Sequence, residues 1–349
     1  MSETWRMPRL YKQGCGCSGI DLHCHVVPSS FPQAPGGGAL KGWPSMMPVV
    51  DCHATVVIDD RPYRTINDAC WVAERRIADM DRAGIQLQTL SPMPELFGYW
   101  IDAEAADHLT RHVNDVIAEL VNEGKGRFVG LGGVPLQDID LSIRELHRLM
   151  HELGFCGVEI GSNINGVPIG DPQFHPFFAE AEKLGAAVFV HAVRPTGMDR
   201  LVGPAPLQQV LAYPTDVGLA AASVITGNLL SLFPTLRIAF SHGGGTLASL
   251  LPRLEQGYST FPALKEALVE PPSLQARRLY ADTLVFDAET LRRVVSMFGA
   301  DKVMLGTDYP FNFRDKEPLA SIETAFADEA IRKQLIFANA LTFLALEEE

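Results

Sequence analysis

Histidine and aspartate residues stand at the ends of short apolar runs along this chain, and both residue types can bind a metal ion or move a proton. His23 and His25 end the run "GIDLHCH", His191 ends "AAVFVH", His242 lies in "FSHGGG", and Asp308 ends "KVMLGTD". Taken singly, each is better explained by an ordinary hydrogen bond. Taken together, they form a donor set for a zinc-type divalent ion, which binds imidazole nitrogen and carboxylate oxygen.

The spacing of His23 and His25 fits one shared ion. Residues i and i+2 of an extended strand point to the same face, so both imidazoles can reach one point while Cys24 points away. We expect one divalent metal ion bound by His23, His25, His191 and Asp308, with room left for water. Zinc (Zn2+) is the favoured ion, and Mn2+, Fe2+ and Co2+ suit the same ligands.

His242 is expected to act as a general acid or base beside the metal. Imidazole titrates near neutral pH and can take a proton from metal-bound water. A His-Gly-Gly-Gly run also occurs in esterase oxyanion holes, but the chain has no G-x-S-x-G motif that would supply a serine nucleophile. Two alternatives stay open: His242 could replace Asp308 as the fourth ligand, and a weakly bound Asp308 could carry a catalytic proton.

Eight apolar runs, most followed by an amphipathic segment of helix length, indicate repeated βα units and a parallel sheet. We expect strands at residues 19–23, 84–90, 127–134, 157–161, 186–191, 237–242, 279–285 and 302–308. Eight units predict an α/β fold of the (β/α)8 TIM-barrel type, in which the carboxyl ends of the strands meet at one mouth. A doubly wound open sheet is disfavoured because the chain lacks a nucleotide-binding glycine motif.

The chain is expected to form a single barrel domain over residues 19–349, after an N-terminal extension at residues 1–18. Residues 28–66, rich in proline and glycine at their start, interrupt the first βα unit. We expect a small insertion there that lies over the barrel mouth and includes a small hairpin.

Composition argues against several classes of function. The chain has 349 residues, a net charge of −13 and 47% hydrophobic residues. Scattered arginines in an acidic chain offer no basic surface for nucleic acid, and no apolar stretch is long enough to span a membrane. Six cysteines without a secretory signal suggest reduced thiols and a cytoplasmic location.

Five motifs, "DLHCH", "RFVGLGGVPLQ", "FVH", "SHGGG" and "GTDYPF", follow one another in an order that resembles the decarboxylases of the amidohydrolase superfamily. The similarity runs from residue 20 to about residue 346. It implies a (β/α)8 barrel with one divalent metal ion, commonly zinc, and members of the family are typically homodimers. The matching metal ligands are His23, His25, His191 and Asp308, and the residue matching His242 activates the metal-bound water.

The same resemblance assigns two arginines to substrate binding. Arg64, in the insertion, matches a residue that holds a substrate carboxylate, and Arg253 matches one contributed across the dimer interface. The planar guanidinium suits this task because it binds a carboxylate with two hydrogen bonds. Arg194 departs from the family pattern, since one member has an aromatic residue near this position. It would bind a second acidic group or a phenolate, or pair with a nearby acid.

We therefore expect a metal-dependent, cofactor-free decarboxylase that acts on a small anionic substrate, an unsaturated or aromatic carboxylic acid. A metal-dependent hydrolase or hydratase acting on a C–C, lactone or amide substrate is the alternative. A second metal ion has no obvious bridging ligand because the fourth strand, "GVEIG", carries no lysine, although Glu159 could bridge in principle. A non-catalytic metal-binding barrel is the remaining, remote alternative.

Overall fold

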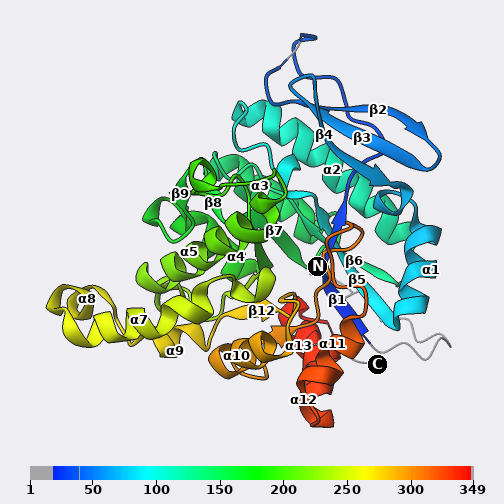
Figure 1. Ribbon diagram of the computed structural model, residues 1–349. Helices are drawn as coiled ribbons and strands as arrows, with labels where there is room; N and C mark the ends of the chain where they lie inside the picture. The colour runs from blue at the N-terminus through cyan, green and yellow to red at the C-terminus, as the bar shows by residue number, and fades with distance from the viewer. Residues whose placement is uncertain (1–18, 39, 347–349) are drawn as a thin grey trace, which may run out of the picture.

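The computed structural model describes residues 19–38 and 40–346, so the extension expected at residues 1–18 lies outside the described residues. Its central feature is an eight-stranded parallel sheet with the strand order β1-β5-β6-β7-β10-β11-β12-β13 (Figure 1). These strands are β1 (Gly19–Val26), β5 (Ile85–Pro92), β6 (Phe128–Gly132), β7 (Gly157–Gly161), β10 (Ala187–His191), β11 (Arg237–Phe240), β12 (Tyr280–Asp282) and β13 (Val303–Met304).

The first and last strands meet and close the sheet into a barrel. The backbone N–H of Leu22 donates to the carbonyl of Leu305 at 2.9 Å, and Cys24 forms a parallel bridge with Tyr309. All eight strands expected from the apolar runs are present. The predicted (β/α)8 barrel is therefore confirmed.

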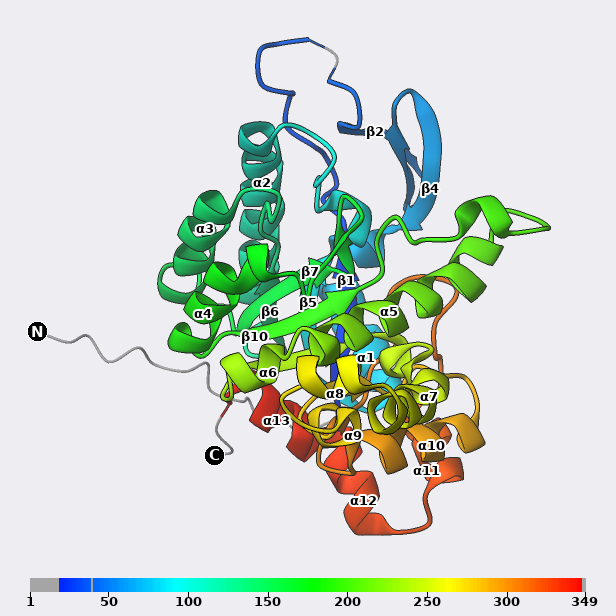
Figure 2. The ribbon, with the colours of Figure 1, turned by 90° about the vertical axis from the view of Figure 1, so that its left-hand side faces the viewer.

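Helices cover the outside of the barrel (Figure 2). They are α1 (Ala73–Ala83), α2 (Ala103–Glu123), α3 (Ile139–His151), α4 (His175–Leu184), α5 (Tyr213–Thr226), α6 (Leu229–Leu232), α7 (Leu247–Thr260), α8 (Pro262–Ala267), α9 (Pro272–Ala276), α10 (Ala288–Phe298), α11 (Pro318–Ala325), α12 (Glu329–Lys333) and α13 (Asn339–Leu344). Local signals set several ends. The Asp102 carboxylate accepts the N–H of Glu104 and caps α2, and Gly84 ends α1 in the left-handed conformation, with φ +72°.

The insertion after β1 carries a three-stranded antiparallel sheet made of β2 (Pro44–Val50), β3 (His53–Ile58) and β4 (Arg61–Asn67). This sheet projects beyond one end of the barrel (Figure 1). The hairpin expected from the sequence corresponds to β3 and β4, and β2 extends it by a strand. A smaller hairpin of β8 (Asn163–Ile164) and β9 (Val167–Pro168) follows β7.

Apolar side chains pack in two layers, one inside the barrel and one between the strands and the helices. The inner layer includes Ile20, Leu22, Leu87, Leu131, Phe189 and Met304, and it also contains Phe343 and Leu344 of α13. The outer layer includes Val158, Val188 and Phe240 from the strands and Leu149 and Phe178 from the helices. Alternate residues of each strand therefore face opposite layers, as the pleat of a strand requires.

An irregularity in β1 breaks this alternation next to the barrel mouth. Leu22 packs in the inner layer, yet the ring centroid of its neighbour His23 also lies only 5.1 Å from that of Phe189, in the same layer. The pairing of β1 with β5 shifts register between Asp21 and Cys24. Such a shift lets successive side chains occupy one face, so β1 supplies both core packing and site residues.

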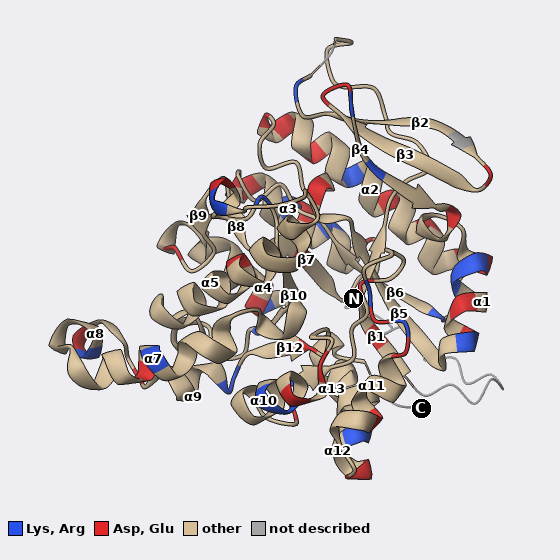
Figure 3. Ribbon diagram, viewed as in Figure 1, with Lys and Arg blue, Asp and Glu red and all other residues tan. Residues whose placement is uncertain are grey.

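Charged residues are spread over the outside of the barrel. Acidic and basic residues are interspersed along the outer helices in Figure 3, and neither sign forms a continuous band in that view. Among the described residues, no helix is both long enough and apolar enough to cross a membrane.

Candidate metal centre

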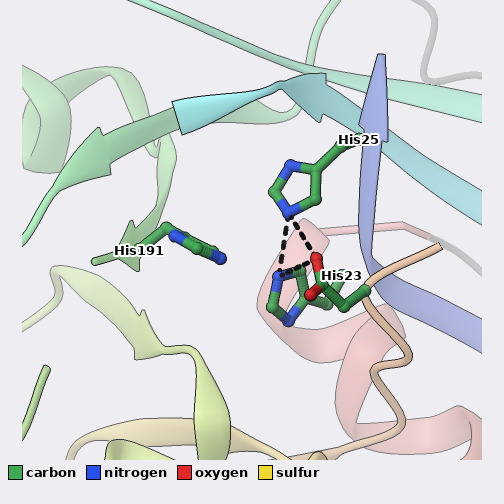
Figure 4. Close-up of side chains that lie close together, drawn as sticks. His23, His25 and His191 are labelled. Atoms are coloured by element: carbon green, nitrogen blue, oxygen red, sulfur yellow. Dashed lines mark hydrogen bonds and ion pairs between the residues drawn. The ribbon is translucent and has the colours of Figure 1, made fainter. Parts of the chain in front are cut away.

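Four side chains from distant parts of the chain meet at the mouth of the barrel. One donor atom from each of His23, His25, His191 and Asp308 lies within 4.8 Å of the other three. Figure 4 shows the three imidazole rings gathered around a carboxylate. These are the residues that the sequence predicted to share an ion, and they come from β1, from β10 and from the loop after β13. Their ligation of a metal stays a prediction.

Hydrogen bonds determine which nitrogen of His23 and of His25 faces the centre. Nδ1 of His23 donates to the buried carboxylate of Asp282 at 2.7 Å, and Nδ1 of His25 donates to the carbonyl of Pro92 at 3.1 Å. Each Nε2 therefore presents a lone pair, and the two Nε2 atoms lie 3.0 Å apart. Since two lone pairs at this distance repel each other, the pair fits a shared cation.

His191 and Asp308 present the other two donor atoms. Nδ1 of His191 donates to the carbonyl of Ala192 at 2.9 Å, which leaves the lone pair on Nε2. Within the described residues, Nε2 of His191 is buried and has no hydrogen-bond partner, and the buried Oδ1 of Asp308 lies 3.0 Å from Nε2 of His25. Buried polar atoms are normally satisfied, so these two atoms also fit a cation at the centre.

Burial and neighbouring charges shift the pKa values of His25 and His191 in opposite directions. Burial lowers the pKa of His25, but the carboxylates of Glu159 and Asp308 outweigh it, so the pKa lies above its ordinary value. Burial, followed by the neighbouring imidazoles of His242 and His23, holds the pKa of His191 well below its ordinary range. His191 is therefore neutral at pH 7, as a histidine must be to bind a metal ion.

His242 stands beside the four residues and not among them. Its ring centroid lies 4.9 Å from that of His191, and its backbone N–H donates to Oδ2 of Asp282 at 3.0 Å. Burial, together with the nearby His23, lowers the pKa of His242 to about 4. The neutral ring can accept a proton at pH 7. The geometry therefore favours Asp308 over His242 as the fourth member of the donor set.

Asp282, at the end of β12, is a site residue that the sequence analysis did not single out. Its Oδ2 accepts the Nδ1–H of His23 and the N–H of His242, and its Oδ1 accepts the N–H groups of Gly243 and Leu284 at 2.7 and 3.1 Å. The carboxylate is completely buried. It therefore orients a ligand and the adjacent base together. A lone aspartate ending the apolar run "LYAD" was the only sequence signal.

A cavity of about 340 Å3 opens on this centre and is lined by His25, His191, His242 and Asp308. Arg64 and Phe311 line it as well. The Arg64 guanidinium lies 4.4 Å from the centroid of the Phe311 ring, which stacks on His25 at 5.3 Å. Arg64 thus reaches the cavity from β4, and the Phe311 ring lies between its guanidinium and His25. Its binding of a substrate carboxylate stays a prediction.

The other two predicted substrate-binding arginines do not line this cavity. Arg194 lines a separate cavity, where its guanidinium lies 3.5 Å from the centroid of the Trp100 ring. The backbone at Arg194 has a positive φ of +39°. Its position therefore gives no support to substrate binding at the metal centre. Arg253 is exposed on α7, and its contribution across a dimer interface stays a prediction.

Two further residues, Glu159 as a possible bridging ligand and Cys24 between the two histidines, were considered from the sequence, and both face away from the centre. Glu159 does not belong to the donor set, and its Oε2 lies 3.8 Å from Nδ1 of His25, on the side away from Nε2. Burial raises the pKa of Glu159 to about 7. Cys24 is completely buried in a small cluster with Ala69 and Tyr309. The donor set therefore describes a centre for one metal ion.

The sequence matches the family model described as Amidohydrolase over residues 20–346. One relative is the 2-amino-3-carboxymuconate-6-semialdehyde decarboxylase of Dictyostelium discoideum. It is 38% identical over 334 residues, which cover 94% of this chain and 92% of that protein.

Solved structures of similar proteins extend this comparison. The 5-carboxyvanillate decarboxylase of Sphingomonas paucimobilis superposes with a TM-score of 0.72 at 28% identity, covering 79% of this chain and 84% of that one. A dihydroxybenzoic acid decarboxylase from a Polaromonas species gives a TM-score of 0.69 at 24% identity, covering 80% and 87%. That protein was solved with bound manganese and the inhibitor 2-nitroresorcinol.

Proposed function

Since this chain belongs to the amidohydrolase family, we propose that it is a metal-dependent decarboxylase of a small unsaturated or aromatic carboxylic acid, with no organic cofactor. The observation that carries the proposal is the arrangement of the donor set beside a neutral base. Three imidazole nitrogens and one carboxylate are directed at a single point, and His242 lies next to them. Relatives named as decarboxylases support the type of reaction.

We propose that His23, His25, His191 and Asp308 hold one divalent ion per chain. When bound, the ion supplies Lewis acidity, which polarises an oxygen atom and lowers its pKa. Zinc is the favoured metal because three imidazoles and one carboxylate suit its preference for few, nitrogen-rich ligands. Manganese is the competing candidate, since it is present in a protein of the same fold.

His242 is proposed to move the proton. Its Nδ1 lies 3.2 Å from the hydroxyl oxygen of Ser241, so Nε2 is the nitrogen left free for a reacting group. Loss of CO2 breaks a carbon–carbon bond and leaves an electron pair on the remaining carbon, which must take up a proton. A neutral imidazole can accept a proton from water or from a substrate oxygen and later deliver one to that carbon. The reaction needs no oxidant or reductant.

Arg64 is proposed to orient the substrate over the donor set. Its guanidinium carbon lies 4.4 Å from the centroid of the Phe311 ring on the wall of the cavity, and a guanidinium can bind a carboxylate there with two hydrogen bonds. Fixing one end of the substrate in this way lowers the entropic cost of reaching the reactive geometry.

The assembly and location are further parts of the proposal. We infer a homodimer in which the exposed Arg253 on α7 serves the pocket of the partner subunit. A cytoplasmic location suits the unpaired thiols, because Cys24, Cys52, Cys70 and Cys156 are all free.

A substrate panel tests the proposed reaction. Metal-replete protein is given small unsaturated and aromatic carboxylic acids, and released CO2 is measured against protein treated with a chelator. We expect CO2 from at least one acid, only with metal present. Turnover of an ester, lactone or enol substrate with no CO2 from any acid would instead assign the centre to a hydrolase or hydratase.

A further inference from the structure

The cavity over the metal centre has a second group of polar side chains that the proposed reaction does not use. Glu95 and Tyr213 line this cavity beside Arg64. Glu95 lies in the helical turn Pro94–Leu96, directly after β5, and Tyr213 is the first residue of α5. A carboxylate on the wall of a pocket that is expected to receive an anion calls for a physical reason.

Tyr213 fixes the position of the Glu95 carboxylate. Its phenol O–H donates to Oε1 of Glu95 at 2.8 Å. The Tyr213 ring is nearly buried and lies 6.0 Å from the ring of His191 and 6.4 Å from that of His242, between centroids. Glu95 is therefore linked through Tyr213 to the two histidines and is bonded to the far end of the phenol. It is not a member of the donor set.

Glu95 and Arg64 share the cavity without forming an ion pair. No nitrogen of Arg64 lies within 4.0 Å of a Glu95 oxygen in the described part of the chain. Arg64 packs on Phe311, whereas Glu95 is bonded to Tyr213. The phenol of Tyr63, on β4, also lies beside the Glu95 carboxylate, whose charge helps burial to raise the pKa of that phenol. Opposite charges are thus presented to one cavity, each held by its own aromatic neighbour.

We propose that Glu95 determines substrate specificity by accepting a hydrogen bond from an amino or hydroxyl group of the substrate. The proposal rests on the decarboxylase function, in which Arg64 binds the carboxylate end. The donor group it selects lies on the part of the substrate remote from the metal, because Tyr213 separates Glu95 from His191 and His242.

The same carboxylate rejects substrates that lack the donor. A substituent without an N–H or O–H would displace water from the Glu95 carboxylate without replacing its hydrogen bonds, and a second carboxylate would meet like charge. A site built to bond a hydroxyl group discriminates strongly against an analogue without it. Glu95 therefore works through ligand binding, and its effect can be measured without turnover.

Ligand binding to metal-loaded protein tests the proposal directly. The probes are 3-hydroxybenzoate and 4-hydroxybenzoate, each compared with its methoxy ether, which retains the oxygen but cannot donate. Affinities are measured by calorimetry for the wild type, Glu95→Gln and Glu95→Leu. Glu104→Gln is the matched control, because Glu104 is an exposed acid on α2 away from the cavity. The bound metal per chain reports that each variant is folded.

We expect the wild type and Glu104→Gln to prefer at least one hydroxybenzoate over its ether by about tenfold or more, the worth of a charge-assisted hydrogen bond. Glu95→Gln should reduce this ratio and Glu95→Leu should abolish it, while ether affinity and metal content are retained. Three results would overturn the proposal. They are equal affinity of the wild type for each hydroxybenzoate and its methoxy ether, no binding of any probe, and an affinity ratio in Glu95→Leu that equals that of the wild type. Release of CO2 is measured in a separate experiment. A negative result for Glu95 would therefore contradict the role of Glu95 and not the decarboxylase function.

Discussion

Replacing Asp282 by asparagine should weaken both metal binding and the fold around it. The carboxylate is completely buried and accepts four hydrogen bonds, two at each oxygen. In asparagine one oxygen becomes an NH2 group, which cannot accept, so two N–H donors lose their partner whichever way the amide lies. Leaving two buried donors unpaired costs about 1–3 kcal/mol each, or about 2–6 kcal/mol of unfolding free energy.

The Asp282→Asn substitution should also lower the affinity for the metal ion. His23 relies on Asp282 to keep its proton on Nδ1 and its lone pair on Nε2. Loss of such a partner typically reduces metal affinity by about 10–100-fold. Affinity is measured by competition with a chromophoric chelator, and stability by urea unfolding of metal-free protein. Asp301→Asn is the matched control, because Asp301 is 67% exposed and should change neither quantity.

The pH dependence of this effect has a defined sign. Burial raises the pKa of Asp282, but His23, the charge of His242 and the N–H of Gly243 lower it by more. The pKa of Asp282 in the folded state therefore lies below its ordinary value. The carboxylate therefore stabilises the fold above the unfolded pKa of about 3.9, and this stability is lost as the pH falls through the folded pKa. The difference in unfolding free energy between the wild type and Asp282→Asn should therefore become smaller below about pH 3.9. Wild-type metal affinity and stability in Asp282→Asn at pH 7 would refute the reasoning.

Five more substitutions test the assignment of individual side chains. Cys24→Ser should leave the metal content intact and His25→Ala should abolish it, as elemental analysis of purified protein will show, because Cys24 packs away from the centre. His242→Asn should lower the turnover number by about 100-fold or more while metal is retained, since general acid–base catalysis is worth that much. Equal loss of metal would make His242 a ligand. Arg64→Ala should raise the KM for the carboxylic acid substrate by about tenfold or more, because a charged hydrogen bond is lost. Arg194→Ala should change this KM by no more than about twofold. A larger increase for Arg194→Ala than for Arg64→Ala in steady-state kinetics would contradict the assignment.

Much of the barrel could be predicted because its signal is local. Each barrel strand coincides with a short apolar run, and the observed strand β7 has the bounds expected from the sequence. Helix α7 was not expected, because glycines precede it and Pro252 lies inside it. Pro252 is the sixth residue of α7, so it removes one hydrogen bond inside the helix, and the carbonyl of Ala248 that loses this partner accepts a bond from Arg293 at 3.4 Å instead.

The donor set could be predicted for a related reason, whereas its supporting residues could not. His23 and His25 are close in sequence and His191 ends a clear strand, so barrel geometry alone brings them together. Asp282 lies 259 positions from His23, and nothing in the local sequence marks their hydrogen bond. Glu95 belongs to no motif either, because its role depends on a tyrosine from another part of the barrel.

Arg194 shows a different case, in which a residue expected at the substrate pocket lines a neighbouring cavity. It follows the fifth strand closely, but its side chain stacks on Trp100 and lines another cavity. Its contact with Trp100 joins two residues 94 positions apart in the chain, and no local pattern in the sequence marks it.

Titration of CO2 release against bound metal tests the central claim most directly. Metal-free protein is given increasing amounts of a divalent ion, and the rate of CO2 release from an accepted acid is followed together with the metal bound per chain. We predict that activity rises linearly and saturates at one ion per chain. Activity that is independent of the metal, or that saturates only at two ions per chain, would contradict a one-metal decarboxylase.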